Sequence, residues 1–174
     1  NTMDKLTLSL LNKSDINEIF SAFKNIGWNK PKNIYETYLS EQLSDTRSVF
    51  VAKIDGQFCA YVTVKWKSDY KEFGQQNIPE IVDLNVLPEF RKQGIGTFLI
   101  HACENTAMER GYSVMGLGVG LTADYGNAQR LYVQLGFLPD GNGIHYKYKA
   151  VKYADSVSVD DNLILYFTKK LPSC

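Results

Sequence analysis

Residues 80–97 read E-I-V-D-L-N-V-L-P-E-F-R-K-Q-G-I-G-T, and this stretch decides the fold. Its pattern predicts a strand over 78–86 that Pro88 ends, a short turn with two glycines, and a helix over 94–110. A helix start leaves about four backbone N–H groups unpaired and carries roughly half a positive charge. The two glycines would let a phosphate come close to the main chain. The stretch therefore predicts an anion site, although two glycines by themselves can also serve packing alone.

The glycine turn fits neither of two common nucleotide-binding patterns. The P-loop pattern G-x-x-x-x-G-K-[ST] is absent, and Leu99 stands where the dinucleotide fingerprint has its third glycine. The identity of the anion must therefore come from the context of the turn.

The segments before this stretch predict two helices and an antiparallel hairpin. A strand over 6–11 precedes a helix that Ser14 or Asp15 can cap, with an apolar face that includes Ile16 and Ile19. The other elements expected here are a helix over 33–44, a hairpin of strands 49–54 and 58–66 joined by Asp55-Gly56, and a polar loop over 68–77.

The segments after this stretch alternate strands and helices. The helix over 94–110 has apolar residues at steps of four, and Gly111 ends it. The elements expected next are a strand over 114–119, a helix over 126–135, strands starting at Phe137, over 146–150 and over 163–169, and an irregular segment over about 150–160. The order predicts a mixed α/β (α+β) fold.

Composition and charge exclude several classes of protein. The chain has 174 residues, 44% of them hydrophobic, which suits a single domain over 1–174. Its 19 basic and 19 acidic residues give zero net charge, which argues against a duplex-binding protein. The longest apolar runs, 58–62 and 163–167, are far shorter than the roughly 20 residues of a membrane-spanning helix.

The cysteines and histidines predict neither a disulfide framework nor a metal site. Cys59, Cys103 and Cys174 are an odd number without C-x-x-C spacing, so we expect a reducing cytoplasm and no metal. His101 and His145 are expected to be structural. We expect the native chain to start at Met3, with no signal segment after it, and leave residues 1–2 out of the reasoning.

The pattern L-N-V-x-P-x-x-R-x-x-G-I-G resembles the acyl-CoA signature of the GNAT superfamily of N-acetyltransferases. Residues 126–137, G-N-A-Q-R-L-Y-V-Q-L-G-F, are similar to a second motif of that superfamily, at the expected distance of about 30 residues. The resemblance covers about 49–148, with a CoA-binding core over about 78–137. It implies a central, mostly antiparallel mixed sheet flanked by helices. One departure is Lys92-Gln93, where the family commonly has glycine followed by Lys or Arg.

The resemblance implies acetyl-CoA as co-substrate and assigns residues to it. The strand residues Leu84, Asn85 and Val86 would pair with its pantetheine. Its pyrophosphate would bind the turn and helix start, formed by Arg91, Lys92, Gln93, Gly94, Ile95, Gly96 and Thr97. For the two basic residues the alternative is a solvated turn. Asn127 would either bind the cofactor or cap its helix, and Tyr132 would contact the cofactor as well.

The resemblance also implies acetyl transfer to an amine by direct attack in a ternary complex. An ammonium with a pKa of about 10.4 is only about 10⁻³ deprotonated at pH 7, so a carboxylate would help. Glu80 and Asp83 are the candidates, with a surface acid or a structural carboxylate as the alternatives. No dedicated base is needed if the amine enters as free base. Tyr132 would protonate the departing thiolate, and the Val86 N–H would bind the oxyanion.

The acceptor and the assembly are left open by the sequence. Six aromatic residues could form an acceptor wall through cation–π attraction, or could simply pack: Trp28, Tyr35, Tyr38, Trp66, Tyr70 and Phe73. The partners expected are acetyl-CoA and an amine, without nucleic acid or membrane. A homodimer could form if 163–167 pairs with a second copy. Two alternatives are a non-catalytic acyl-CoA-binding module and a nucleotide-binding module.

Overall fold

The computed structural model describes residues 2–173, which divide into two compact units. The first unit contains the chain up to Trp66 together with Val82–Asn105, and the second contains Lys67–Ile81 together with the chain from Thr106 onward. Strand β4 (Glu80–Val86) contributes to both units, because its first two residues belong to the second unit and the rest to the first. Each unit is described by itself below.

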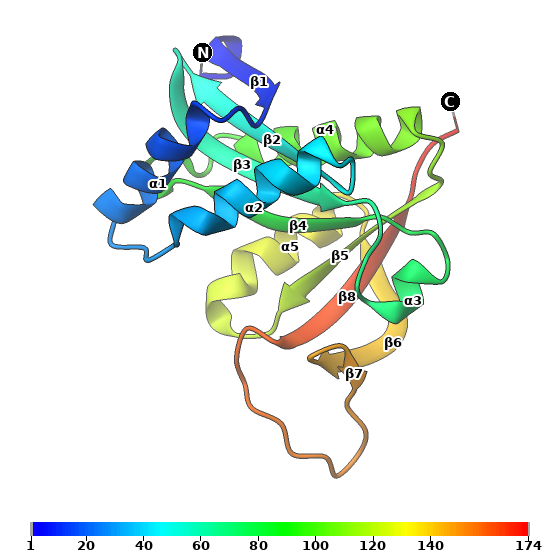
Figure 1. Cartoon of the computed structure of the whole chain (residues 1–174). Helices are drawn as coiled ribbons and strands as arrows, with labels where there is room; N and C mark the ends of the chain where they lie inside the picture. The colour runs from blue at the N-terminus through cyan, green and yellow to red at the C-terminus, as the bar shows by residue number, and fades with distance from the viewer. Residues whose placement is uncertain (1, 174) are drawn as a thin grey trace. The chain divides into compact units, whose positions relative to one another are not determined.

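The first unit places two helices against antiparallel strands (Figure 1). Its elements are the short 3-10 helix η1 (Thr2–Lys5), β1 (Leu6–Leu10), α1 (Asp15–Asn25), α2 (Lys32–Leu43), β2 (Arg47–Ile54), β3 (Gln57–Lys65), the end of β4, the 3-10 turn η2 (Pro88–Phe90) and most of α4 (Ile95–Glu109). The strand order is β1-β2-β3-β4. Asp55 and Gly56 both have positive φ, 50° and 80°, as a two-residue hairpin turn requires, so the predicted hairpin is confirmed.

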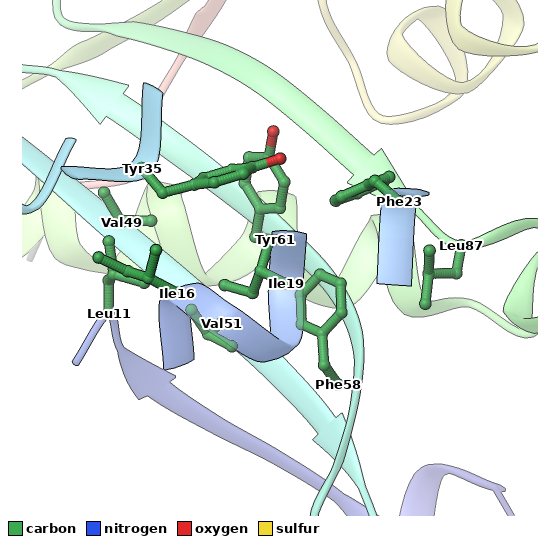
Figure 2. Packing of buried hydrophobic residues seen from close by; sticks show 10 residues of the cluster. All are labelled: Leu11, Ile16, Ile19, Phe23, Tyr35, Val49, Val51, Phe58, Tyr61 and Leu87. Carbon is green, nitrogen blue, oxygen red and sulfur yellow. The ribbon is translucent and has the colours of Figure 1, made fainter. Parts of the chain in front are cut away.

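Apolar side chains from both helices and from β2 and β3 fill the core of the first unit (Figure 2). The buried cluster is Leu11, Ile16, Ile19, Phe23, Tyr35, Val49, Val51, Phe58, Tyr61 and Leu87. A polar contact supports this packing, because the Gln42 side chain donates to the Leu11 carbonyl and accepts from the Val49 N–H. Helix α2 is thereby held to the strands at a fixed register.

The second unit is built on strands with one parallel pairing. Its elements are α3 (Lys71–Gly74), the start of β4, β5 (Val114–Gly120), η3 (Ala123–Tyr125), α5 (Gly126–Gln134), β6 (Leu138–Tyr146), β7 (Lys149–Ala150) and β8 (Leu163–Lys170). The strand order is β4-β5-β8-β6-β7. The β4–β5 pairing is parallel, whereas β5–β8, β6–β8 and β6–β7 are antiparallel. The expected mixed α/β architecture with mostly antiparallel pairing is confirmed.

Glycines in β5 let aromatic side chains lie directly on the strand. A Cβ at Gly116 would collide with the ring of Phe73, and one at Gly118 would collide with Ile164 and Tyr166. Tyr70 and Tyr166 stack with their ring centroids 3.6 Å apart. The predicted polar loop over 68–77 is therefore wrong in part: α3 forms inside it, because Tyr70 and Phe73 are buried against Ile78 and Tyr166.

Three further predictions need correction. Ser14 holds the N-cap position of α1 without a side-chain capping hydrogen bond, and Asp15 does not cap the helix, because its carboxylate accepts the Asn12 N–H at 2.8 Å and pairs with Lys53 at 2.8 Å. The strand expected over 146–150 is instead a turn at Lys147 and Tyr148, both with positive φ, between β6 and β7. Pairing of 163–167 with a second copy is wrong, because β8 is already paired along both edges, with β5 and β6.

The close packing on β5 leads to a stability prediction. Gly116→Ala should destabilise the protein by about 1–3 kcal/mol, because the Phe73 ring must move away from the new methyl group. Gly126→Ala is the matched control: its Cβ would meet open space among the described residues at the start of α5, so stability should stay the same or rise. The unfolding midpoint in urea measures both. Equal midpoints for the two variants would contradict the packing argument.

Candidate functional site

A carboxylate on β4 gathers polar side chains from several elements of the first unit. Asp83 accepts hydrogen bonds from the Tyr38 hydroxyl at 2.8 Å and the Tyr61 hydroxyl at 2.6 Å, both on Oδ2. The Asn85 side-chain amide donates to Oδ1 at 2.6 Å and to the Tyr61 hydroxyl at 3.2 Å. The Lys30 ammonium lies 3.6 Å from Oδ1. We call these five residues the Asp83 cluster.

The backbone of β4 is unusual at this point. Asp83 has a φ of +61°, in the left-handed region that Asp adopts more readily than most residues but that still costs energy. Contacts from three other segments stabilise this conformation. Tyr38 of α2 and Tyr61 of β3 donate hydrogen bonds to the carboxylate, and Lys30 of the linker between α1 and α2 pairs with it. The Asp83 side chain stays 21% exposed, so a solute can still reach it.

Burial and the Asp83 charge keep the neighbouring tyrosines protonated. Burial, followed by the negative charge of Asp83, raises the pKa of Tyr38 and of Tyr61. Burial also raises the pKa of Tyr35 to about 12. At neutral pH the hydroxyls of Tyr38 and Tyr61 therefore remain donors to the carboxylate.

A buried arginine, Arg47, holds the Tyr38 ring of the cluster in place. The Arg47 guanidinium lies over the Tyr38 ring at 4.3 Å, and its Nε donates to Glu41 at 2.8 Å. Its Nη1 donates to Thr63 at 2.6 Å, and Thr63 in turn donates to the Val82 carbonyl at 2.9 Å. These contacts fix the Tyr38 ring and connect β3 to β4, so the position of Asp83 is set from two sides.

The glycine turn follows β4 in the first unit. Arg91, Lys92, Gln93 and Gly94 are exposed, Lys92 and Gly94 have positive φ, and the Gly94 carbonyl accepts the Phe98 N–H at 3.0 Å as α4 begins. Arg91 donates from Nε to the Val86 carbonyl at 3.3 Å, and its guanidinium lies 5.6 Å from the Trp28 ring centre. The turn thus presents two basic side chains beside a helix start.

The remaining residues assigned to the cofactor differ in exposure. Leu84, Asn85, Val86, Gly96 and Thr97 are half-buried. The Ile95 side chain is buried in the core, which leaves its backbone as the part able to face an anion. Of the residues assigned to the site, Asp83 and the whole segment from Leu84 to Thr97 belong to the first unit. Among them, Asp83 and Asn85 are joined by a hydrogen bond between their side chains.

Glu80, Asn127 and Tyr132 belong to the second unit. Glu80 is half-buried and accepts the Ser68 hydroxyl on Oε1 at 2.5 Å. Tyr132 is 9% exposed, and its ring centre lies 6.3 Å from that of Phe137. Asn127 is exposed inside the first turn of α5, and the N-cap position belongs to Tyr125, so the capping alternative for Asn127 is wrong.

Lys30 and Tyr61 were missed by the sequence reasoning. Tyr61 lies in an apolar strand run, where its hydroxyl gave no signal, and Lys30 lies in a linker 53 residues before Asp83. Of the aromatic residues proposed as an acceptor wall, Trp28 and Tyr38 are half-buried beside or in the cluster, and Tyr35 and Trp66 are buried by packing. Tyr70 and Phe73 belong to the core of the second unit.

Across residues 2–173, no group of three or more His, Cys, Asp or Glu side chains is arranged to hold a metal ion. His145 is buried as a structural residue would be, with Nε2 3.7 Å from Glu72. In the part of the chain that the structure describes, no helix is long and apolar enough to cross a membrane.

The raised tyrosine pKa values predict alkaline instability. In the unfolded chain a tyrosine ionises near pH 10, whereas the folded protein holds the Tyr35 proton up to a pKa of about 12. The contribution of Tyr35 to the unfolding free energy should therefore be constant below about pH 10 and fall between about 10 and 12, because the unfolded state then binds fewer protons. Urea midpoints across this range measure it. Tyr35→Phe should make the decline shallower, whereas the exposed Tyr153→Phe should not.

Comparisons with known proteins agree on one family. Residues 13–137 match the family model described as "Acetyltransferase (GNAT) family". An uncharacterised N-acetyltransferase of Archaeoglobus fulgidus is 38% identical over 103 residues, which cover 58% of this chain and 65% of that protein. The chain thus spans less than two thirds of that relative's length.

Solved structures show the same fold at low sequence identity. An N-acetyltransferase from Staphylococcus aureus Mu50 has a TM-score of 0.70 at 16% identity, covering 96% of this chain and 99% of that one. A GNAT family acetyltransferase from Elizabethkingia anophelis, solved with acetyl-CoA bound, has a TM-score of 0.62 at 17% identity, covering 97% and 99%. The family match spans more than half of the chain and includes the glycine turn that follows β4: this chain belongs to the GNAT family of acetyltransferases.

Proposed function

We propose that this chain is an N-acetyltransferase that transfers the acetyl group of acetyl-CoA to a primary amine by direct attack in a ternary complex. The observation that carries the proposal is the turn from Arg91 to Gly94. It lies inside the matched family segment, is exposed, and places two basic side chains beside the start of α4. A pyrophosphate bound there would meet the backbone N–H groups of a helix start as well as those charges.

The residues of the turn fit a diphosphate. The backbone at Gly94, with a φ of +84°, would be strained for any side chain, and no side chain intervenes between a ligand and the main chain there. The Arg91 guanidinium could bind phosphate either by moving away from the Trp28 ring or while it stays in contact with that ring. The Lys92 side chain is exposed and can turn toward the ligand. Leu84, Asn85 and Val86 would pair with the pantetheine arm through their backbone.

The chemistry needs a proton acceptor, a proton donor and a site for the oxyanion. The amine must lose a proton before attack, with Glu80 or Asp83 as base unless the amine arrives uncharged. The Val86 N–H would bind the oxyanion, and the Tyr132 hydroxyl would protonate the departing thiolate. Both oxygens of Asp83 already accept hydrogen bonds, which favours a role in holding charge over a role in taking a proton.

We favour a small-molecule amine as acceptor, because the half-buried Asp83 carboxylate, 21% exposed, offers a single charged contact of that size. Cys59 and Cys103 are free and buried, which suits the reducing cytoplasm we propose.

A homodimer would need a surface other than β8. A non-catalytic acyl-CoA-binding module of the same fold is the alternative function.

Acetyl-CoA turnover with a panel of amines tests the activity. Thiol release should appear with one class among polyamines, aminoglycosides, amino acids and lysine peptides. Tyr132→Phe should lower kcat by roughly 10²-fold and leave acetyl-CoA affinity unchanged, because a general acid acts in the transition state. If neither protein releases thiol with any amine while both bind acetyl-CoA, the non-catalytic module is the correct reading. ATP binding as tight as acetyl-CoA binding would point to a nucleotide module.

Two neutral variants separate the candidate bases. If Glu80 is the base, Glu80→Gln should lower kcat/KM by about 10²-fold at pH 7 and remove the acidic limb of the pH profile. Asp83→Asn should then act mainly on the KM of the acceptor, because it removes a charge that binds rather than one that takes the proton. The reverse assignment of effects would make Asp83 the base, and unchanged pH profiles in both would mean that the amine arrives uncharged.

A further inference from the structure

A primary ammonium of the chain itself, that of Lys30, lies beside the partly exposed Asp83 carboxylate. The Lys30 Nζ lies 3.6 Å from Asp83 Oδ1 and 5.6 Å from the centre of the Phe23 ring. The Phe23 ring is stacked on the Trp28 ring, with the two ring centroids 5.4 Å apart, and this contact fixes its position. A carboxylate together with an aromatic face is the combination that attracts organic ammonium ions. Lys30 therefore shows which ligand chemistry this position takes.

The carboxylate is held ready for a cation even without Lys30. Tyr38 and Tyr61 hold Oδ2, Asn85 holds Oδ1, and all three donors are neutral. They fix the orientation of the carboxylate and leave its negative charge uncompensated. Within the cluster, the compensating charge comes from Lys30.

Lys30 is able to leave this position. Its side chain is 26% exposed, it lies in the linker between α1 and α2, and it contacts the carboxylate at ion-pair distance. Partly exposed ion pairs of this kind are held weakly, because water compensates both charges when they separate. Another ammonium can therefore exchange with it without unfolding any element.

We propose that Asp83 and the Phe23 ring form a binding site for an ammonium group of the acceptor, that Lys30 fills it as an internal competitor, and that the acceptor is a linear polyamine. This inference rests on the proposed function for the role of the second amine. Asp83 lies three residues before Val86 on β4, so an ammonium held at Asp83 is not the amine that would attack an acetyl group at Val86. An acceptor anchored at Asp83 thus needs a second amine for the reaction, as a linear polyamine has.

Binding of spermidine to the full-length chain, measured by calorimetry without acetyl-CoA, tests the site. Lys30→Met keeps the aliphatic stem but removes the competing charge, so spermidine should bind about five- to tenfold more tightly. Lys30→Arg keeps the competing charge and should bind as the parent does, which separates the effect of the charge from that of any change at residue 30. Asp83→Asn should bind at least tenfold more weakly. Lys32→Met, an exposed lysine at the start of α2, is the matched control and should change nothing.

The outcomes separate this inference from the proposed activity. Unchanged or weaker spermidine binding in Lys30→Met, with an unaltered melting temperature, would overturn it, and so would parental affinity in Asp83→Asn. Thermal melts identify a variant that fails to fold, in which case Lys30→Gln and Asp83→Ser replace it. Spermidine binding without any thiol release would keep the site and refute the transferase. Thiol release with amino acids or peptides, in a chain that does not bind spermidine, would do the opposite.

Discussion

The hydrogen bonds that converge on the Asp83 carboxylate are the constraint on which the first unit depends. A half-buried carboxylate is tolerated only where donors replace its water, and here the donors come from α2, β3 and β4 itself. The same contacts hold a non-glycine residue at a φ of +61° in the middle of a strand. Packing, backbone strain and charge thus meet at one residue, and moving Tyr38 or Tyr61 would remove a hydrogen-bond donor from this half-buried carboxylate.

The two proposed substrates, acetyl-CoA and the amine acceptor, would be bound by different kinds of contact. The diphosphate of acetyl-CoA would contact backbone N–H groups and two exposed basic side chains, a device contained within seven consecutive residues. The acceptor would contact a carboxylate and aromatic rings that come from separate elements.

The packing of the second unit depends on two glycines of β5, which have no side chain, rather than on charged groups. Gly116 and Gly118 leave the surface of β5 flat enough for Phe73 and Tyr166 to lie on it. Tyr70 stacks on Tyr166 and donates its hydroxyl to Asp140 at 2.6 Å. The short helix α3 forms in a segment of polar sequence because its Phe73 and the Tyr70 before it are buried in this way, so tertiary packing overrides the local pattern.

The sequence by itself determined the elements whose signals are local. The hairpin follows from Asp55-Gly56, the long α4 from apolar residues at steps of four, and the glycine turn from a motif of 13 residues, because backbone preference and periodicity act over a few residues. The tertiary structure alone decided that Lys30, Tyr38 and Tyr61 meet at Asp83, and that β8 lies between two strands instead of at an edge. The contacts with Asp83 join residues 22 to 53 positions apart, and a single sequence carries no signal for which distant polar groups will satisfy one another.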